Sequence, residues 1–148
     1  MHAYPQVMEY AEHVLELWSD VDDPETATGK TRVDILRQAA EAAYYTGDFQ
    51  RAEWFVTAAL QLVDEKTSPV LAGRLTERVG RFRWVSGQPA ETTEQAYRRA
   101  VELIPPVPAT SDRAQVLGIA GLVHDAAAAT RRSGGVVPAG NRDRTRGR

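Results

Sequence analysis

Residues 28–31, Thr-Gly-Lys-Thr, have the side chains and the order with which a phosphate-binding loop ends. Such a loop needs another glycine five residues before Gly29, so that successive backbone N–H groups can wrap around the phosphate. Pro24 stands at that place and has no N–H to donate. No strand-like run precedes the segment. We therefore interpret residues 28–31 as a loop that leads into a helix cap, and we expect no bound cofactor.

Four carboxylates lie just before this segment, at Asp20, Asp22, Asp23 and Glu25. Their oxygen atoms are numerous enough to coordinate calcium. A helix–loop–helix calcium site also needs a glycine at its turn and a glutamate at its end, and the segment has neither in the required place. A solvated acidic linker is the interpretation we prefer.

The three histidines, His2, His13 and His124, are dispersed along the chain. Glu9 and Glu16 flank His13 at helical spacing, but two or three ligands on one exposed face rarely hold a metal tightly. No serine has the glycine-flanked spacing of a nucleophile, and the chain has no cysteine for thiolate chemistry or disulfides. We therefore predict no catalytic, metal-binding or cofactor-binding residue and no enzyme.

Charge is distributed unevenly along the 148 residues, a length that suits one domain. From Arg131 onward, six arginines and Asp143 give +5, so the other 12 basic and 19 acidic residues give −7. An acidic body argues against direct nucleic-acid binding by the folded part, although the basic tail could contact phosphates. No apolar run approaches the roughly 20 residues of a membrane span, and the N-terminus lacks the features of a signal peptide. We expect a cytoplasmic protein that does not enter a membrane.

Residues 42–60 predict a helical hairpin. Gly47 can adopt the left-handed backbone that ends a helix, and Asp48 can cap the next helix. One apolar stripe with helical spacing then follows: Ala52, Phe55, Val56, Ala59, Leu60 and Val63. A short turn between two such helices folds them antiparallel.

The same periodicity predicts an all-α domain over residues 1–125 with about six helices. Thr31 and Asp34 have capping-box spacing, and Ser68-Pro69 supplies a cap and a first-turn proline. The expected helical segments are 8–18, 31–47, 48–64, 68–87, 90–104 and 111–125, with a loop over 19–29. Residues 126–148, rich in Ala, Gly and Arg, are expected to form a disordered low-complexity tail.

The helices repeat in pairs. The corresponding segments are 44–49 with 83–88, and 56–62 with 97–103. Gly47 and Gly87 are 40 residues apart, and Ala59 and Ala100 are 41 apart. A period of this size with two helices per unit predicts stacked helical repeats, because each hairpin needs a neighbour to cover its apolar face.

These units resemble the tetratricopeptide repeat. The matching positions are the turn Gly47-Asp48-Phe49, the small residues Ala52, Ala59 and Ala100, the close-packing Gly80 and the closing Pro105. The period is longer than the usual roughly 34 residues, Thr93 stands where alanine is expected, and one residue is inserted after Gly87. The resemblance implies a right-handed superhelix of antiparallel hairpins.

In such repeats the inner face of each hairpin's first helix usually binds the partner. By matching positions, the resemblance implies a partner-binding groove formed by Arg37, Glu41, Tyr44, Tyr45, Arg74, Glu77, Arg81 and Trp84. Arginine beside aromatic residues suits an acidic ligand or a peptide. In the alternative interpretation, Tyr44 and Trp84 only pack between hairpins and the arginines pair with nearby glutamates.

Segments 40–48, 78–87 and 96–105 also resemble the helical-repeat region of large LuxR-type transcriptional regulators of high-GC bacteria, and the likeness extends over about residues 5–123. In those proteins an ATPase module precedes the repeats and a DNA-binding domain follows them. The resemblance implies a non-enzymatic sensor or coupling segment that binds a ligand, a protein or another domain of the regulator.

Two other functions remain open: a free-standing adaptor that binds an acidic peptide or protein in its groove, and a small enzyme whose site is assembled by oligomerisation. The oligomeric state is open as well. Because 8–18 looks like the last helix of one unit and 111–125 like the first helix of another, we expect a fragment of a longer repeat protein.

Overall fold

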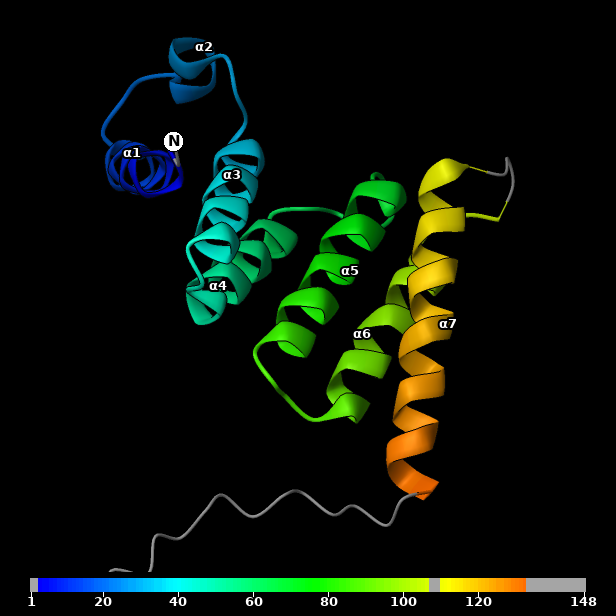
Figure 1. Ribbon diagram of the computed structural model, residues 1–148. Helices are drawn as coiled ribbons and strands as arrows, with labels where there is room; N and C mark the ends of the chain where they lie inside the picture. Colours follow the sequence, from blue (N-terminus) through cyan, green and yellow to red (C-terminus); the bar gives the residue numbers. More distant parts are fainter. Residues whose placement is uncertain (1–2, 107–109, 133–148) are drawn as a thin grey trace, which may run out of the picture.

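The computed structural model describes residues 3–106 and 110–132, and its regular elements there are all α-helices (Figure 1). They are α1 (Tyr4–Leu17), α2 (Pro24–Thr28), α3 (Arg32–Tyr45), α4 (Phe49–Gln61), α5 (Pro69–Val85), α6 (Ala90–Leu103) and α7 (Ser111–Arg132). The all-α prediction is confirmed. Neither described range contains a helix that is both long and apolar enough to cross a bilayer.

The helices pack pairwise in chain order. Helices α3 and α4 form one hairpin and α5 and α6 form the next, while α1 packs against α3 and α7 packs against α6 (Figure 1). Helix α4 also packs against α5, which joins the two hairpins, and α7 touches α5. Helices α3, α5 and α7 thus follow one another along the stack.

The helix ends form as their local sequence predicts. Gly47 adopts a φ of 82° and Gly87 a φ of 75°, the left-handed backbone that glycine accepts without a Cβ clash. The Oδ1 atom of Asp48 accepts from the Arg51 N–H at 3.2 Å. Thr31 and Asp34 form the predicted reciprocal capping box, with bonds of 3.2 and 3.1 Å.

One predicted cap is made only in part. Ser68 precedes α5 and Pro69 begins it, as expected, but the Ser68 side chain forms no capping hydrogen bond. The backbone of Ser68 has a φ of −134° and a ψ of 57°. Pro69 has no backbone N–H, so the first turn of α5 has one fewer N–H group that needs a partner outside the helix.

The core consists of one cluster over α1, α3, α4 and α5 and a second, smaller one where α6 packs against α7. Phe55, Val79 and Ala100 are buried, as the apolar stripes predict. At Gly80 an added Cβ would lie 3.0 Å from Cε2 of the Tyr97 ring. The predicted close packing of α5 against α6 at Gly80 is confirmed.

Helix α7 corrects the predicted domain boundary. We expected folded structure to end at residue 125 and a disordered tail to begin at 126, but the helix continues to Arg132. Alanine is the strongest helix former, so the run Ala126–Ala129 extends a helix where we interpreted it as loss of pattern. Ala127 is buried and anchors this extension. The rest of the predicted tail, residues 133–148, lies outside the described residues.

The predicted loop over residues 19–29 contains the short helix α2. Its first turn is capped by Asp23, whose Oδ1 accepts from the Thr26 N–H at 3.2 Å, and Pro24 occupies the first helical position. Helix α1 also begins earlier than predicted, at Tyr4 instead of residue 8, with Pro5 in its first turn. The described part of the chain therefore has seven helices where about six were expected.

Candidate functional site

A groove of about 860 Å³ crosses the stack along α1, α3, α5 and α7. Its apolar lining includes Val56, Leu75, Phe82 and Val116, and Tyr4 and Tyr10 of α1 line one end. Charged residues of α3, α5 and α7 complete the lining. A concave surface with an apolar base and polar walls is the usual form of a binding site.

Four of the eight predicted groove residues line this groove: Arg37 and Glu41 of α3, and Arg74 and Glu77 of α5. Residues one helical turn apart share a face, so each pair points to the same side of its helix. The structure thus brings together the two halves that sequence matching assigned to one surface. Their part in binding stays a prediction.

The other four, Tyr44, Tyr45, Arg81 and Trp84, do not line the groove. The Tyr44 ring packs on Phe82 with 5.4 Å between centroids, and the Arg81 guanidinium lies 5.0 Å from the Tyr44 centroid. Tyr44 therefore packs between the hairpins, as the alternative interpretation proposed.

Tyr45 and Trp84 are more exposed than Tyr44. The Tyr45 ring stacks on Tyr4 at a centroid distance of 4.6 Å, which ties α3 to the start of α1. Trp84, near the end of α5, is exposed. Both lie near the hairpin turns, at the far end of the helix faces that carry the groove residues.

The charges of the groove balance. Its cations are Lys30, Arg37, Arg74 and Arg78, and its carboxylates are Asp34, Glu41, Glu77 and Asp112. Two ion pairs join neighbouring first helices: Arg78 Nε lies 3.2 Å from Glu41 Oε1, and Arg74 Nη1 lies 3.3 Å from Asp112 Oδ1. The groove therefore has alternating charge and no single sign.

Sequence reasoning missed Arg78 and Asp112. Arg78 lies four residues after Arg74, and this helical spacing was a signal that could have placed it on the same face. Asp112 belongs to α7, and we had matched positions only on the helices that correspond to α3 and α5.

Glu77 is the buried acid of the groove. Only 7% of the residue is exposed, and its Oε1 atom has no hydrogen-bond partner among the described residues. Burial raises the pKa of this carboxyl, while the nearby Arg78, 3.9 Å from Oε2, opposes the rise. A buried carboxylate with one oxygen left without a hydrogen bond is costly, so this position favours the neutral acid more than a surface glutamate does.

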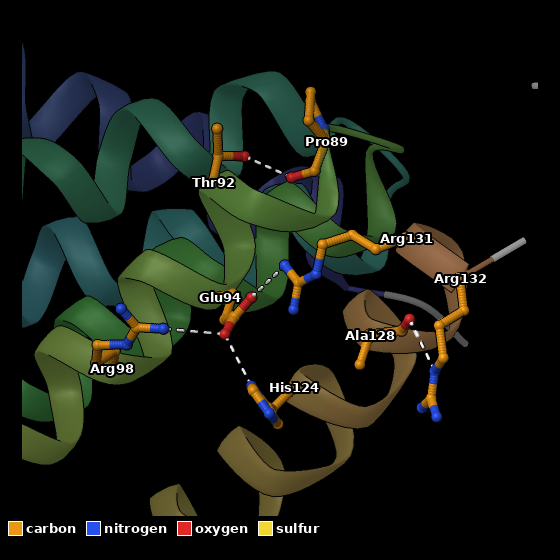
Figure 2. Close-up of polar contacts among 8 residues, drawn as sticks. All are labelled: Pro89, Thr92, Glu94, Arg98, His124, Ala128, Arg131 and Arg132. Carbon is orange, nitrogen blue, oxygen red and sulfur yellow. Dashed lines mark hydrogen bonds and ion pairs between the residues drawn. The ribbon is translucent and has the colours of Figure 1, made fainter. Parts of the chain in front are cut away.

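A second polar cluster lies outside the groove, between α6 and α7 (Figure 2). Glu94 accepts from Arg98 at 3.0 Å and lies 2.8 Å from His124 Nδ1 and 3.2 Å from Arg131 Nη1. The hydrogen bond with His124, together with Arg131, lowers the pKa of Glu94. These contacts join two packed helices, and we assign them a structural part.

The residues first considered for phosphate or metal chemistry have other roles. Thr28 Oγ1 donates to the Pro24 carbonyl at 2.7 Å, and Lys30 Nζ donates to Gln38 Oε1 at 3.0 Å. Asp23 caps α2. Within residues 3–106 and 110–132, no three His, Asp or Glu side chains gather closely enough to hold a metal ion.

No protein-family model, no curated protein and no solved structure matches the chain.

Proposed function

We propose that this chain is a non-enzymatic, tetratricopeptide-like interaction module that binds an extended segment of a protein partner in the groove along α3, α5 and α7. The observation that carries the proposal is the groove itself, about 860 Å³ in volume and lined by the first helix of each successive pair. The hairpin order and the 40- to 41-residue period fit a right-handed superhelix, whose inner face these helices would form.

The charges of the groove favour one kind of partner over another. An acidic peptide would have to displace Asp112 from Arg74 and Glu41 from Arg78, because both arginines already have carboxylate partners. A segment that carries both charges can exchange each ion pair for an equivalent one. We therefore propose a partner with apolar residues and both charges, and we rank a purely acidic peptide below it.

The test uses peptides selected from a random library on the wild-type chain. Each enriched peptide is titrated calorimetrically against the wild type and against the triple variant Arg37→Ala, Arg74→Ala, Arg78→Ala. Removing these half-buried contacts is expected to weaken binding by about tenfold or more. The unfolding temperature of the variant shows whether the fold is retained.

The matched control is Arg99→Ala, because Arg99 forms ion pairs with Glu65 and Glu102 and does not line the groove. It should leave every peptide affinity unchanged. Peptides that bind the triple variant as tightly as the wild type would show that the groove is not the site, and the proposal would be abandoned.

We further propose, from the resemblance in segments 40–48, 78–87 and 96–105, that the module derives from the sensor or coupling segment of a LuxR-type regulator. Binding in the groove would then bias an ATPase switch in the same regulator. DNA sequencing around the coding region tests this context: reading frames for an ATPase module upstream and a helix-turn-helix domain downstream are expected. Flanking DNA without either would refute the regulator context and leave the groove proposal standing.

A further inference from the structure

The first helix of the stack has two apolar faces. One packs into the core through Met8, Ala11, Leu15 and Trp18. The other carries Val7, Tyr10 and Leu17, which recur at helical spacing and are exposed, Tyr10 by 60%. Within the described residues, no helix packs over this second face.

Helix α7, the last described helix, also has one buried and one exposed apolar face. Val116, Val123 and Ala127 of α7 are buried, whereas Leu117 is 45% and Leu122 is 72% exposed. Between these two leucines lie Gly118 and Gly121, and a Cβ on either glycine would meet nothing within 4 Å. The outer side of α7 thus has an open, shallow apolar patch around Leu117 and Leu122, with the exposed Asp125 one turn beyond it.

The two faces belong to complementary halves of a hairpin. Helix α7 stands in the stack where α3 and α5 stand, but no described helix follows it as α4 follows α3 and α6 follows α5. Helix α1 is of the other kind: it packs against the first helix of the next pair, α3, as α4 packs against α5. Within residues 3–106 and 110–132, each end of the stack therefore has no helix of the kind that the other end provides.

The repeat period places Gly121 of α7 at the position that corresponds to Gly80 of α5. Ala40, Gly80 and Gly121 follow one another at 40 and 41 residues, the period of the repeat. At Gly80 the space is filled by Tyr97 and Ala96 of α6, whereas at Gly121 it is empty. Matching the ends of α1 and α6 places Tyr10 in the position of Ala96, so the exposed tyrosine is the side chain that such a contact would bring to Gly121.

Charge also favours contact between unlike ends. Residues 1–23 contain six acidic residues and no lysine or arginine, whereas α7 ends in Arg131 and Arg132. Two equal ends would repel each other, but one copy's N-terminal end attracts another's C-terminal end.

We propose that α7 of one copy binds α1 of a second copy, so that the two end helices form a hairpin between chains and continue the stack head to tail. Such a contact is heterologous and leaves one free end of each kind, so association does not stop at a dimer. Val7 and Tyr10 also line the α1 end of the groove, so this contact would cover that end and leave the part along α3, α5 and α7 open.

The first experiment measures the mass of the full chain by light scattering and sedimentation over a wide range of protein concentration. The mean mass is expected to rise steadily with concentration and to exceed that of a dimer. A chain that stays monomeric at the highest concentration would overturn the proposal, and so would one that stops at a dimer.

The second experiment uses two charge variants, Tyr10→Asp on α1 and Leu122→Asp on α7. Each variant alone should be monomeric, because every contact needs one face of each kind, and a buried carboxylate should weaken the contact by about a hundredfold or more. An equimolar mixture should form a one-to-one dimer and go no further, since each variant keeps the face that the other has lost. If both variants remain monomeric in the mixture, the head-to-tail arrangement is wrong.

Trp54→Asp is the matched control, because Trp54 is an exposed aromatic residue of α4 that lies on neither end face. It should associate as the wild type does, and loss of association in this variant would refute the assignment to the end helices. Circular dichroism checks the fold of each variant. Leu17→Asp tests the α1 face if Tyr10→Asp does not fold.

Discussion

Arg131 of α7 lies 3.2 Å from Glu94 of α6, from Nη1 to Oε2, and this ion pair holds the C-terminal end of α7 against its neighbour (Figure 2). Glu94 is 37 residues away in the sequence and also contacts His124, two turns earlier on α7. One carboxylate thus fixes two points of the helix that extends beyond the predicted end of the domain.

Replacing Glu94 by glutamine should loosen this end of α7. The amide keeps the shape of the side chain but loses the charge that pairs with Arg131. We expect backbone amides 124–132 to exchange several-fold faster with deuterium, as measured by mass spectrometry. Glu102→Gln is the control, because Glu102 pairs with Arg99 on the exposed side of α6. Unchanged exchange in the Glu94 variant would show that apolar packing alone holds the helix.

The same carboxylate predicts a pH dependence. His124 and Arg131 lower the pKa of Glu94, so the folded state binds this proton less tightly than the unfolded state does. Its contribution to stability is present above the ordinary carboxyl pKa and is lost as the pH falls through the lowered value. Urea titrations at successive acidic pH values should show a steeper loss of stability in the wild type than in Glu94→Gln.

Gly80 tests the close approach of α5 and α6. A Cβ at this position would lie 3.0 Å from the Tyr97 ring and 3.2 Å from the Ala96 Cβ. Gly80→Leu should therefore lower the free energy of unfolding by about 1–3 kcal/mol through overpacking. Gly118→Leu, measured in dilute solution, is the control because nothing lies within 4 Å of that position. Equal melting temperatures for Gly80→Leu and the wild type would contradict this packing.

Local signals predicted the helix ends well. The φ of Gly47, the cap at Asp48 and the capping box of Thr31 and Asp34 depend on residues within a few positions of one another. Such interactions form whichever way the helices later pack. The end of α7 was missed because we interpreted the run Ala126–Ala129 as loss of pattern, although alanine favours helix, and because the contacts with Glu94 belong to a different helix.

The groove was half predicted for a geometric reason. Arg81 and Tyr44 lie seven residues after Arg74 and Arg37, so they point to nearly the same side of their helices. Tyr44 instead packs on Phe82, and the Arg81 guanidinium lies over the Tyr44 ring. Sequence spacing gives the face of a helix, but it does not give the contacts that take these two side chains out of the groove lining.

Glu77 predicts a second pH dependence of the opposite sign. Burial raises its pKa, so the folded state binds this proton more tightly than the unfolded state does. The contribution of Glu77 to the stability of the fold is fully present at pH values below the ordinary carboxyl pKa. It is lost as the pH rises through the raised pKa of the folded state. Glu77→Gln should therefore be more stable than the wild type at neutral pH and should lose this advantage in acid. Glu16→Gln, at an exposed position of α1, should change neither.

Thr93 provides a test at the one position where threonine replaces the small residue that the repeat pattern expects. It is fully buried, and its Oγ1 atom has no hydrogen-bond partner among the described residues. Thr93→Ala removes an unsatisfied hydroxyl and should raise the free energy of unfolding by about 1 kcal/mol, although the lost methyl group offsets part of the gain. Chemical denaturation measures the change.

Thr92→Ala is the matched control for this prediction, because the neighbouring hydroxyl is exposed and donates to the Pro89 carbonyl at 2.8 Å. Its loss should leave stability unchanged or slightly lower. The two substitutions remove the same atoms from adjacent positions of α6, so helix propensity changes equally in both. A difference in sign between them therefore reports the hydrogen-bonding state of the hydroxyl. If Thr93→Ala destabilised the chain as much as Thr92→Ala or more, Thr93 Oγ1 would have to be satisfied.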